Sequence, residues 1–168
     1  MAIGIDGLPL IAYYNRNTRL VSTVHCTDRD CTASDVVAHT SSGSAGEFLD
    51  LAIGADGRPV ISLYENTTHA NQTTEFNLKL LRCADVACTS SSAVIVDETA
   101  DVGQHNSVAI RSNGMPVIAY RAEGTKSLRV AHCTDEKCLA KTSTLIDSAS
   151  NTGEYVELII GADGLGVM

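Results

Sequence analysis

One unit recurs along the whole chain, and this repetition constrains the fold more than any other feature of the sequence. The unit begins at an isoleucine that precedes an Asp-Gly or Asn-Gly turn, and the equivalent isoleucines are Ile3, Ile53, Ile110 and Ile160. The steps between them are 50, 57 and 50 residues. Self-similarity at a period of this length is typical of tandem arrays of supersecondary units. We therefore predict a repeat protein whose copies share one local structure.

The cysteines fall in the same register as the isoleucines. Each of the first three copies holds one Cys-x4-Cys pair, whose first cysteine follows the turn glycine by 19, 26 or 19 residues. The pairs are Cys26 and Cys31, Cys83 and Cys88, and Cys133 and Cys138. The longer middle copy carries its extra residues in the polar segment 65–74, which has no core pattern. We predict a lengthened hairpin loop there.

Each copy contains the signals of four short β-strands. In the second copy these strands are predicted at 48–54, 59–64, 77–83 and 93–97. Asp-Gly between the first two is a tight-turn signal, and the third strand alternates apolar with polar residues. The first strand is apolar on both faces at its end, which indicates burial on both sides. Four strands with the first one most buried is the pattern of a β-propeller blade.

The predicted fold class is therefore all-β, with about three β-propeller blades of four antiparallel strands in this chain. Blade 1 is predicted over residues 1–46 with a truncated inner strand, blade 2 over 47–102 and blade 3 over 103–152. Residues 153–168 are predicted to give the first strand of a further blade. A β-sandwich or a β-solenoid is the alternative fold, because repeat architectures are distinguished only by period and strand count.

Composition limits the classes of partner. The chain has 168 residues, 44% of them hydrophobic, with two Phe, five Tyr and no Trp, and its formal net charge is -8. An acidic chain without a Lys/Arg cluster argues against binding to nucleic acid or to an anionic membrane. No apolar run approaches the length that spans a bilayer. The first fifteen residues lack a signal-peptide pattern, so we expect that any export signal has been removed or lies outside this segment.

The repeat consensus resembles a known group of proteins. Asp-Gly-x-Pro-Val-Ile-x-Tyr-Tyr followed by Leu-x-Val-x-His-Cys-x4-Cys is similar to the tandem repeats of secreted, mostly uncharacterised bacterial β-propeller proteins. The resemblance covers nearly the whole chain and implies the propeller fold and an extracellular setting, but it implies no catalytic residues. The chain departs from the consensus at Arg82 in place of His, Leu63 and Arg121 in place of Tyr, and Gly166 in place of Pro. The matching residues in the first copy are Pro9, Tyr13, Tyr14, Val24, His25, Cys26 and Cys31.

The paired cysteines have two interpretations. As disulfides, they would close the turn after the third strand of each copy and contribute about 2 kcal/mol each in the chain-entropy model. As metal sites, they would offer two thiolates and at most one adjacent histidine, whereas structural zinc takes four ligands. The even, repeated spacing favours three disulfides, and we predict no metal and no cofactor. Disulfides imply maturation in an oxidising compartment.

Other repeated polar positions have structural interpretations. His25 and His132 share the parity of the apolar residues in their strand, so we expect them to face a blade interface with Arg82 in the equivalent place. The repeated Gly-x-Asp-Gly lacks the alternating carboxylates of a calcium loop, and Asn113 replaces the aspartate in the third copy. Turn chemistry explains this motif better than metal binding does.

The candidate ligand site lies at the start of the first strand in each copy. One register there holds Glu47 and Phe48, Gln104 and His105, and Glu154 and Tyr155. In a propeller these residues would gather at one mouth of the central channel, where polar side chains beside a ring are the composition of a sugar or small-molecule site. The alternative interpretation is a solvated strand end.

Two further predictions concern chemistry on the surface. The segment 65–74 contains two Asn-x-Thr sequons, so Asn66 and Asn71 are candidate glycosylation sites in a eukaryotic secretory route. The chain has no arginine cluster, no Gly-x-Ser-x-Gly elbow and no phosphate loop, and its carboxylates are scattered. We therefore predict that it is not an enzyme, with a sialidase-like glycosidase fragment as the remaining enzymatic alternative.

Three blades do not close a propeller, which needs at least about four. The sequence thus predicts a non-catalytic, extracellular repeat module with a structural or adhesive role that associates with itself. Two copies would pair as three plus three blades, or chains would join head to tail into a fibre, unless the segment belongs to a longer repeat protein. The alternative function is a carbohydrate-binding lectin that uses Phe48, His105 and Tyr155. Its partners would be glycans, and low aromatic content counts against it.

Overall fold

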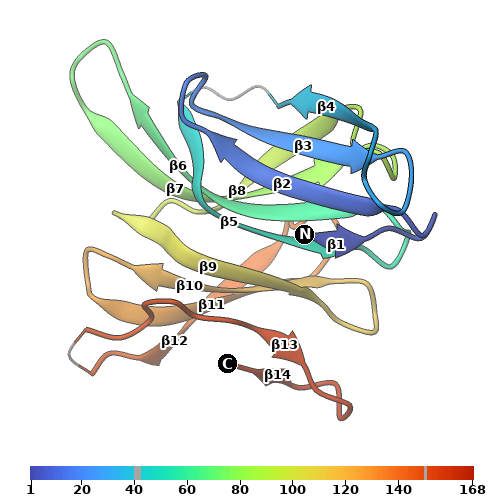
Figure 1. Cartoon of the computed structure of the whole chain (residues 1–168). Coiled ribbons are helices and arrows are strands. Elements are labelled where there is room, and N and C mark those ends of the chain that lie inside the picture. The colour runs from blue at the N-terminus through green and yellow to red at the C-terminus, as the bar shows by residue number, and fades with distance from the viewer. Residues whose placement is uncertain (40–42, 150) are drawn as a thin grey trace.

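The computed structural model describes residues 1–39, 43–149 and 151–168, and its strands form sheets in chain order (Figure 1). Residues 40–42 and 150 fall within the predicted units 1–46 and 103–152 and lie outside the described residues. The first sheet contains β1 (Ala2–Ile3), β2 (Pro9–Asn15), β3 (Leu20–Cys26) and β4 (Ser34–Ala38). The second contains β5 (Ser44–Ile53), β6 (Pro59–Thr68), β7 (Thr74–Cys83) and β8 (Ser91–Asp97). The third contains β9 (Val102–Ile110), β10 (Pro116–Ala122), β11 (Ser127–Cys133) and β12 (Lys141–Asp147), and a last hairpin contains β13 (Ile159–Ile160) and β14 (Gly166–Val167).

Each sheet is an antiparallel meander in which consecutive strands pair. The prediction of an all-β chain with four antiparallel strands per copy is therefore confirmed. In the fourth copy, the described residues 151–168 form only the short β13–β14 pair.

The turn between the first two strands has the same geometry in all four copies. Its glycine has a positive φ, 76° at Gly7 and 80° at Gly57, which a residue without Cβ adopts without steric cost. The residue before the glycine accepts a hydrogen bond from the backbone two positions on, as Asp56 Oδ1 does from Arg58 N at 3.1 Å. Asn113 makes the same bond to Met115 N at 3.1 Å, so the position needs a side-chain oxygen rather than a charge. The prediction of turn chemistry at this motif is confirmed.

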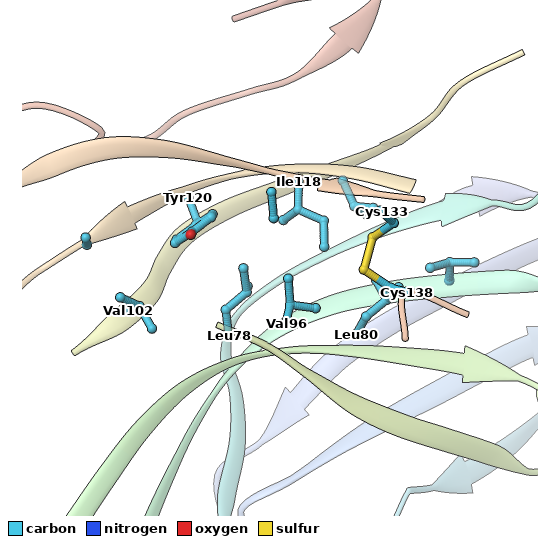
Figure 2. Packing of buried hydrophobic residues seen from close by; sticks show 12 residues of the cluster. Leu78, Leu80, Val96, Val102, Ile118, Tyr120, Cys133 and Cys138 are labelled. Carbon is cyan, nitrogen blue, oxygen red and sulfur yellow. A yellow bond between two sulfur atoms is a disulfide. The ribbon is translucent and has the colours of Figure 1, made fainter. Parts of the chain in front are cut away.

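Apolar side chains form the core between consecutive sheets. In β6, Ile61 and Leu63 face the first sheet while Val60 faces the third, because successive side chains of a strand point to opposite faces. Figure 2 shows the second of these interfaces, where Leu78 and Leu80 lie opposite Ile118 and Tyr120. The second sheet is thus buried on both faces. A third cluster places Leu158 and Val156, from the segment before the last hairpin, against β9, β10 and β11 of the third sheet; its sheet residues are Ala109, Val117, Ala119 and Val130.

Three disulfides join the Cys-x4-Cys pairs, Cys26–Cys31, Cys83–Cys88 and Cys133–Cys138, as predicted. An aspartate two residues after the first cysteine organises each loop: Asp28 accepts bonds from Thr32 N at 3.0 Å and Ala33 N at 3.0 Å. Backbone donors hold the pKa of Asp28 and of Asp135 below its usual value, and at Asp85 the hydroxyl of Thr89 is the main cause of the same lowering of the pKa. Cys88 and Cys138 are buried against the preceding sheet, whereas Cys31 is exposed.

The prediction of a loop over 65–74 was wrong for most of that segment. β6 and β7 continue through it with three further cross-strand pairs, Asn66 with Phe76, Thr67 with Glu75 and Thr68 with Thr74. Only residues 69–73 form the turn. Threonine has a high strand propensity, and the ladder satisfies the backbone of these polar residues. Glu65 is buried but forms an ion pair with Lys79, so a polar sequence here is compatible with a strand.

A buried histidine lies between the first and second sheets. His39 is 4% exposed, and its Nε2 lies 2.9 Å from Thr23 Oγ1 while its Nδ1 lies 2.8 Å from Ser91 Oγ. The Sγ of Cys88 is 3.6 Å from the same Nε2. Burial lowers the pKa of His39 below 6.5, because desolvation disfavours the imidazolium. The interface between the first and second sheets therefore contains His39 in its neutral form.

Candidate ligand groove on the first strands

A glycine of positive φ lies at a bulge of the first strand in the second and third copies and at the equivalent position before β13. Gly46 and Gly103 have φ of 103°, and Gly153 has φ of 88°. The ladder shifts register here, between Ala45 and Leu49 in the second sheet. A Cβ on Gly103 would lie 2.9 Å from Leu78 Cα on the preceding sheet. Glycine is therefore required both for the backbone conformation and for the close approach of consecutive sheets.

The bulge places three aromatic rings in one row across consecutive copies. The ring centroids of Phe48 and His105 are 4.6 Å apart, and those of His105 and Tyr155 are 4.7 Å apart. His105 has φ of 47° and Tyr155 has φ of 55°. A positive φ is uncommon in residues other than glycine, and such backbone strain clusters at ligand sites. The register predicted from the sequence thus corresponds to a physical row of rings.

The row lies in an open groove of about 630 Å³ that we call the first-strand groove. Three equivalent segments line it, 47–51 of β5, 105–108 of β9 and 155–158 before β13. Glu47, Phe48, His105 and Tyr155 of the predicted site therefore line one space. Tyr155 is the most exposed of the rings, at 85%.

Two of the predicted site residues point elsewhere. The Nε2 of Gln104 donates to Asp101 Oδ1 at 3.4 Å. Glu154 Oε1 lies 3.7 Å from the Nη1 of Arg121 and accepts from Asn151 Nδ2 at 3.3 Å. Neither lines the groove, whereas Glu47, the equivalent residue of the second copy, does.

Polar side chains that the sequence analysis missed form the floor of the groove. Asp50 Oδ2 accepts from Ser107 Oγ at 2.9 Å and from Val108 N at 2.9 Å. Ser107 Oγ in turn accepts from Leu158 N at 3.0 Å. Asp50 and Ser107 occupy equivalent positions. In both copies this side chain therefore accepts a hydrogen bond from a backbone N–H of the following copy. Asn106 Nδ2 adds bonds to Phe48 O at 3.0 Å and Gly103 O at 2.8 Å.

A second periodic contact joins each sheet to the lead of the next. Tyr14 contacts Ser44 Oγ at 2.7 Å, and Tyr64 donates to Asp101 Oδ1 at 3.1 Å. In the third copy Arg121 Nη2 donates to Asn151 Oδ1 at 2.8 Å. The three contacts occupy one register. The only signal in the sequence was the repeated tyrosine, since serine, aspartate and asparagine alternate on the other side.

Carboxylates dominate the charge of the first-strand groove. Glu47, Asp50 and Glu157 line it, and no lysine or arginine does so among the described residues. Burial lowers the pKa of His105, Glu154 opposes the shift and Arg121 reinforces it. The ring of His105 is thus neutral near pH 7. The guanidinium of Arg121 is 1% exposed and donates to Glu123 Oε2 at 2.6 Å and Thr152 O at 2.6 Å.

The histidine and arginine of the third strands contact the turn of their own copy. His25 Nε2 lies 2.9 Å from Asp6 Oδ2, and Arg82 Nη2 lies 2.6 Å from the equivalent Asp56 Oδ2. In the third copy, where Asn113 replaces the aspartate, His132 contacts Arg111 instead. Arg82 also reaches the Cys-x4-Cys loop of the next copy, through Glu136 O at 3.0 Å. The expectation that this position faces an interface therefore describes Arg82 better than His25.

The two sequons lie at the end of the β6–β7 hairpin. Asn71 is exposed in the turn, and its Oδ1 accepts from Thr73 N at 3.1 Å. Asn66 lies within β6 and is half-buried. Their glycosylation stays a prediction. Among the residues that the structure describes, no three His, Cys, Asp or Glu side chains gather as a metal site, and no helix is long and apolar enough to cross a membrane.

Comparison with known proteins identifies a likeness of fold. No family model matches the sequence, and no curated protein matches it. The crystal structure of a protein of unknown function from Dyadobacter fermentans DSM 18053 is similar, with a TM-score of 0.67 and 15% identity over 96% of this chain. The match covers 53% of that chain, so the present chain spans about half the length of the solved structure. The arrangement of sheets described here therefore recurs in a solved protein, and the likeness extends to the fold alone.

Proposed function

We propose that the chain is an arc of an extracellular β-propeller, a non-catalytic repeat module with a structural or adhesive role that associates through its two outer sheet faces. Three meander sheets in series, each with its first strand beside the first strand of the next, are the arrangement of consecutive blades. The contacts between β5 and β9 and between β9 and β13 support this proposal. The three disulfides support an oxidising, extracellular setting.

The observation that carries the proposal is the register of the exposed faces. The second sheet packs on the first through Ile61, Leu63 and Leu81. The equivalent residues of the first sheet, Ile11, Tyr13 and Val24, lie on its outer face, where Tyr13 is 36% exposed. The outer face of the first sheet therefore presents the same positions that the second sheet uses to pack on the first sheet.

The third sheet offers the matching face. Val96 of the second sheet packs in the interface with the third, and its equivalent in the third sheet, Ile146, is 46% exposed. A second copy of this chain fits here, because the outer face of its first sheet repeats the registers that already pack between sheets. Two such contacts would close a ring of six sheets, and a rotation that fails to close would give a fibre.

Light scattering of mixed variants tests this proposal. We expect a dimer or a polymer for the parent chain and a monomer for both Tyr13→Asp and Ile146→Asp, since each change puts a charge into both symmetry-related contacts. A mixture of the two variants retains one intact contact per pair and should regain a dimer. Ala70→Asp in the exposed β6–β7 turn is the control and should associate like the parent. A monomeric parent, or a mixture that stays monomeric, contradicts the proposal.

A second candidate function is ligand binding at the first-strand groove, as in a lectin. The ring row of Phe48, His105 and Tyr155 favours it, because aromatic faces in a groove of several hundred Å³ are typical of small-molecule sites. Nothing comparable favours a glycosidase among the described residues. A screen of the protein against immobilised glycans, with Tyr155→Ala as the negative control, tests this second candidate.

A further inference from the structure

We propose that the first-strand groove selects ligands in which a positively charged amine adjoins a flat or apolar ring. This inference rests on the second candidate function, ligand binding at the groove, and names the class of ligand. Amino sugars and other ring-bearing ammonium compounds belong to this class. A neutral sugar would use the rings alone and would leave the carboxylates of the groove without a counter-charge.

The charge of the groove carries the first step of the argument. Glu47 and Asp50 of β5 and Glu157 of the segment before β13 line the same space, and Glu157 occupies the position equivalent to Asp50. Among the described residues, no hydrogen bond or ion pair engages the side chain of Glu47 or Glu157. Asp50 already accepts two bonds from the neighbouring strand. The two glutamates are therefore the carboxylates that a bound cation would meet first.

The absence of a competing cation is the second step. Arg121 is the positive group that acts on His105 of the ring row, and it is buried with its donors bound to Glu123, Thr152 and Asn151. The hydrogen bonds of its guanidinium are thus all made within the protein, and it does not neutralise the carboxylates of the groove. No lysine or arginine lines the groove among the described residues. A cationic ligand would meet an uncompensated negative potential.

The ring row supplies the third step. Phe48, His105 and Tyr155 stand at centroid distances of 4.6 and 4.7 Å, and Tyr155 is 85% exposed. The face of an aromatic ring attracts a cation within about 6 Å of its centroid, and it also stacks on apolar sugar faces. Rings beside carboxylates therefore favour a ligand that has both features over one that has either alone.

The backbone of the fold holds the ring row and the polar floor of the groove in place. His105 and Tyr155 adopt a positive φ, and the glycine two residues before each also has a positive φ. Asn106 fixes the backbone of Phe48 and of Gly103 at once. Equivalent glycines, rings and polar floor residues recur from copy to copy. This repetition indicates a built surface, because solvated strand ends do not require strained aromatic residues.

Calorimetry with two tetrasaccharides tests the inference. The probes are the tetramer of glucosamine and the tetramer of N-acetylglucosamine, which share their rings and differ in charge at about pH 6, below the usual pKa of such amines. We expect the glucosamine tetramer to bind about tenfold more tightly, from combined ion pairing and cation–π attraction. Glu47→Gln and Glu157→Gln should each weaken its binding about threefold. Neither change should alter binding of the N-acetylated tetramer.

Further variants separate charge from rings and from folding. Tyr155→Ala should weaken both tetramers, whereas the control Leu139→Ala, at an exposed apolar side chain outside the groove, should change neither. Glu98→Gln, an exposed carboxylate after β8, should change nothing. Equal binding of the two tetramers, insensitive to the glutamate variants, would overturn charge selection while ligand binding at the groove stands. Binding of neither tetramer would overturn the ligand function together with this inference.

Discussion

At the scale of single residues, the interfaces between sheets are held by polar groups as well as by apolar packing. His39 stands where the second sheet has Val96, and it uses both ring nitrogens against Thr23 and Ser91. A neutral imidazole satisfies both hydroxyls, whereas an imidazolium would be a buried charge without a counter-ion. The first interface thus depends on the protonation of one side chain.

A pH dependence follows from His39. Its pKa in the folded chain is lowered below 6.5 by burial, so the unfolded chain takes up a proton that the folded chain refuses. The free energy of unfolding is highest above about pH 6.5 and should fall as the pH drops below that value. In His39→Val the fall between pH 7 and 5 should be shallower, measured from urea midpoints at both values. His69→Gln, at an exposed histidine, should keep the slope of the parent. An unchanged slope in His39→Val would refute this assignment.

At the scale of the element, the repeat made some features predictable and concealed others. The turn glycines and the cysteines recur as the same residue types, and the ring register recurs as a ring in each copy, so their positions followed from periodicity. The contacts of Tyr14 with Ser44, Tyr64 with Asp101 and Arg121 with Asn151 did not, because both partners change type from copy to copy. The length of β6 was also not predictable, because a polar segment that contains Glu65 has the composition of a loop. The ion pair with Lys79 that allows Glu65 to be buried in a strand is not visible in the sequence.

The bulge in β9 makes a prediction at this scale. Gly103→Ala should lower the free energy of unfolding by about 2–4 kcal/mol, because the new Cβ meets Leu78 Cα at 2.9 Å in a backbone of φ 103°. Gly124→Ala is the matched control, since its nearest contacts are at 3.7 and 4.0 Å, and it should shift stability by less than about 1 kcal/mol. Urea denaturation of the two variants measures the difference. Equal stability of the two would show that β9 tolerates a side chain at the bulge.

At the scale of the whole molecule, stability depends on neighbours. The second sheet is buried against both others, so its interior strands combine two interfaces, as in other arrays where each repeat contacts only its neighbours. All of the residues of β12 are exposed. The chain should therefore be least stable at its outermost strand and most stable in the middle.

Hydrogen exchange followed by mass spectrometry tests this gradient. Amides of β6 and β7 should be the best protected, and those of β12 should exchange at least about tenfold faster, because local opening costs less where few buried contacts must break. In a sample shown to be assembled by light scattering, β12 should gain protection if it lies beside the new interface. Uniform protection across the three sheets would contradict the gradient.

The long hairpin of the second sheet has a consequence for how such chains vary. Its extra residues add three pairs beyond Glu65 and Asn77, at the end of β6 and β7 that is remote from the disulfide. Equal numbers of residues added to β6 and β7 at this turn leave the pairing of the rest of the hairpin unchanged. Every other side chain of the two strands therefore keeps its face of the sheet and its neighbours. Length polymorphism, epitope tags or grafted peptides are thus best accommodated at residues 69–73, because an insertion there leaves the packing between the sheets unchanged.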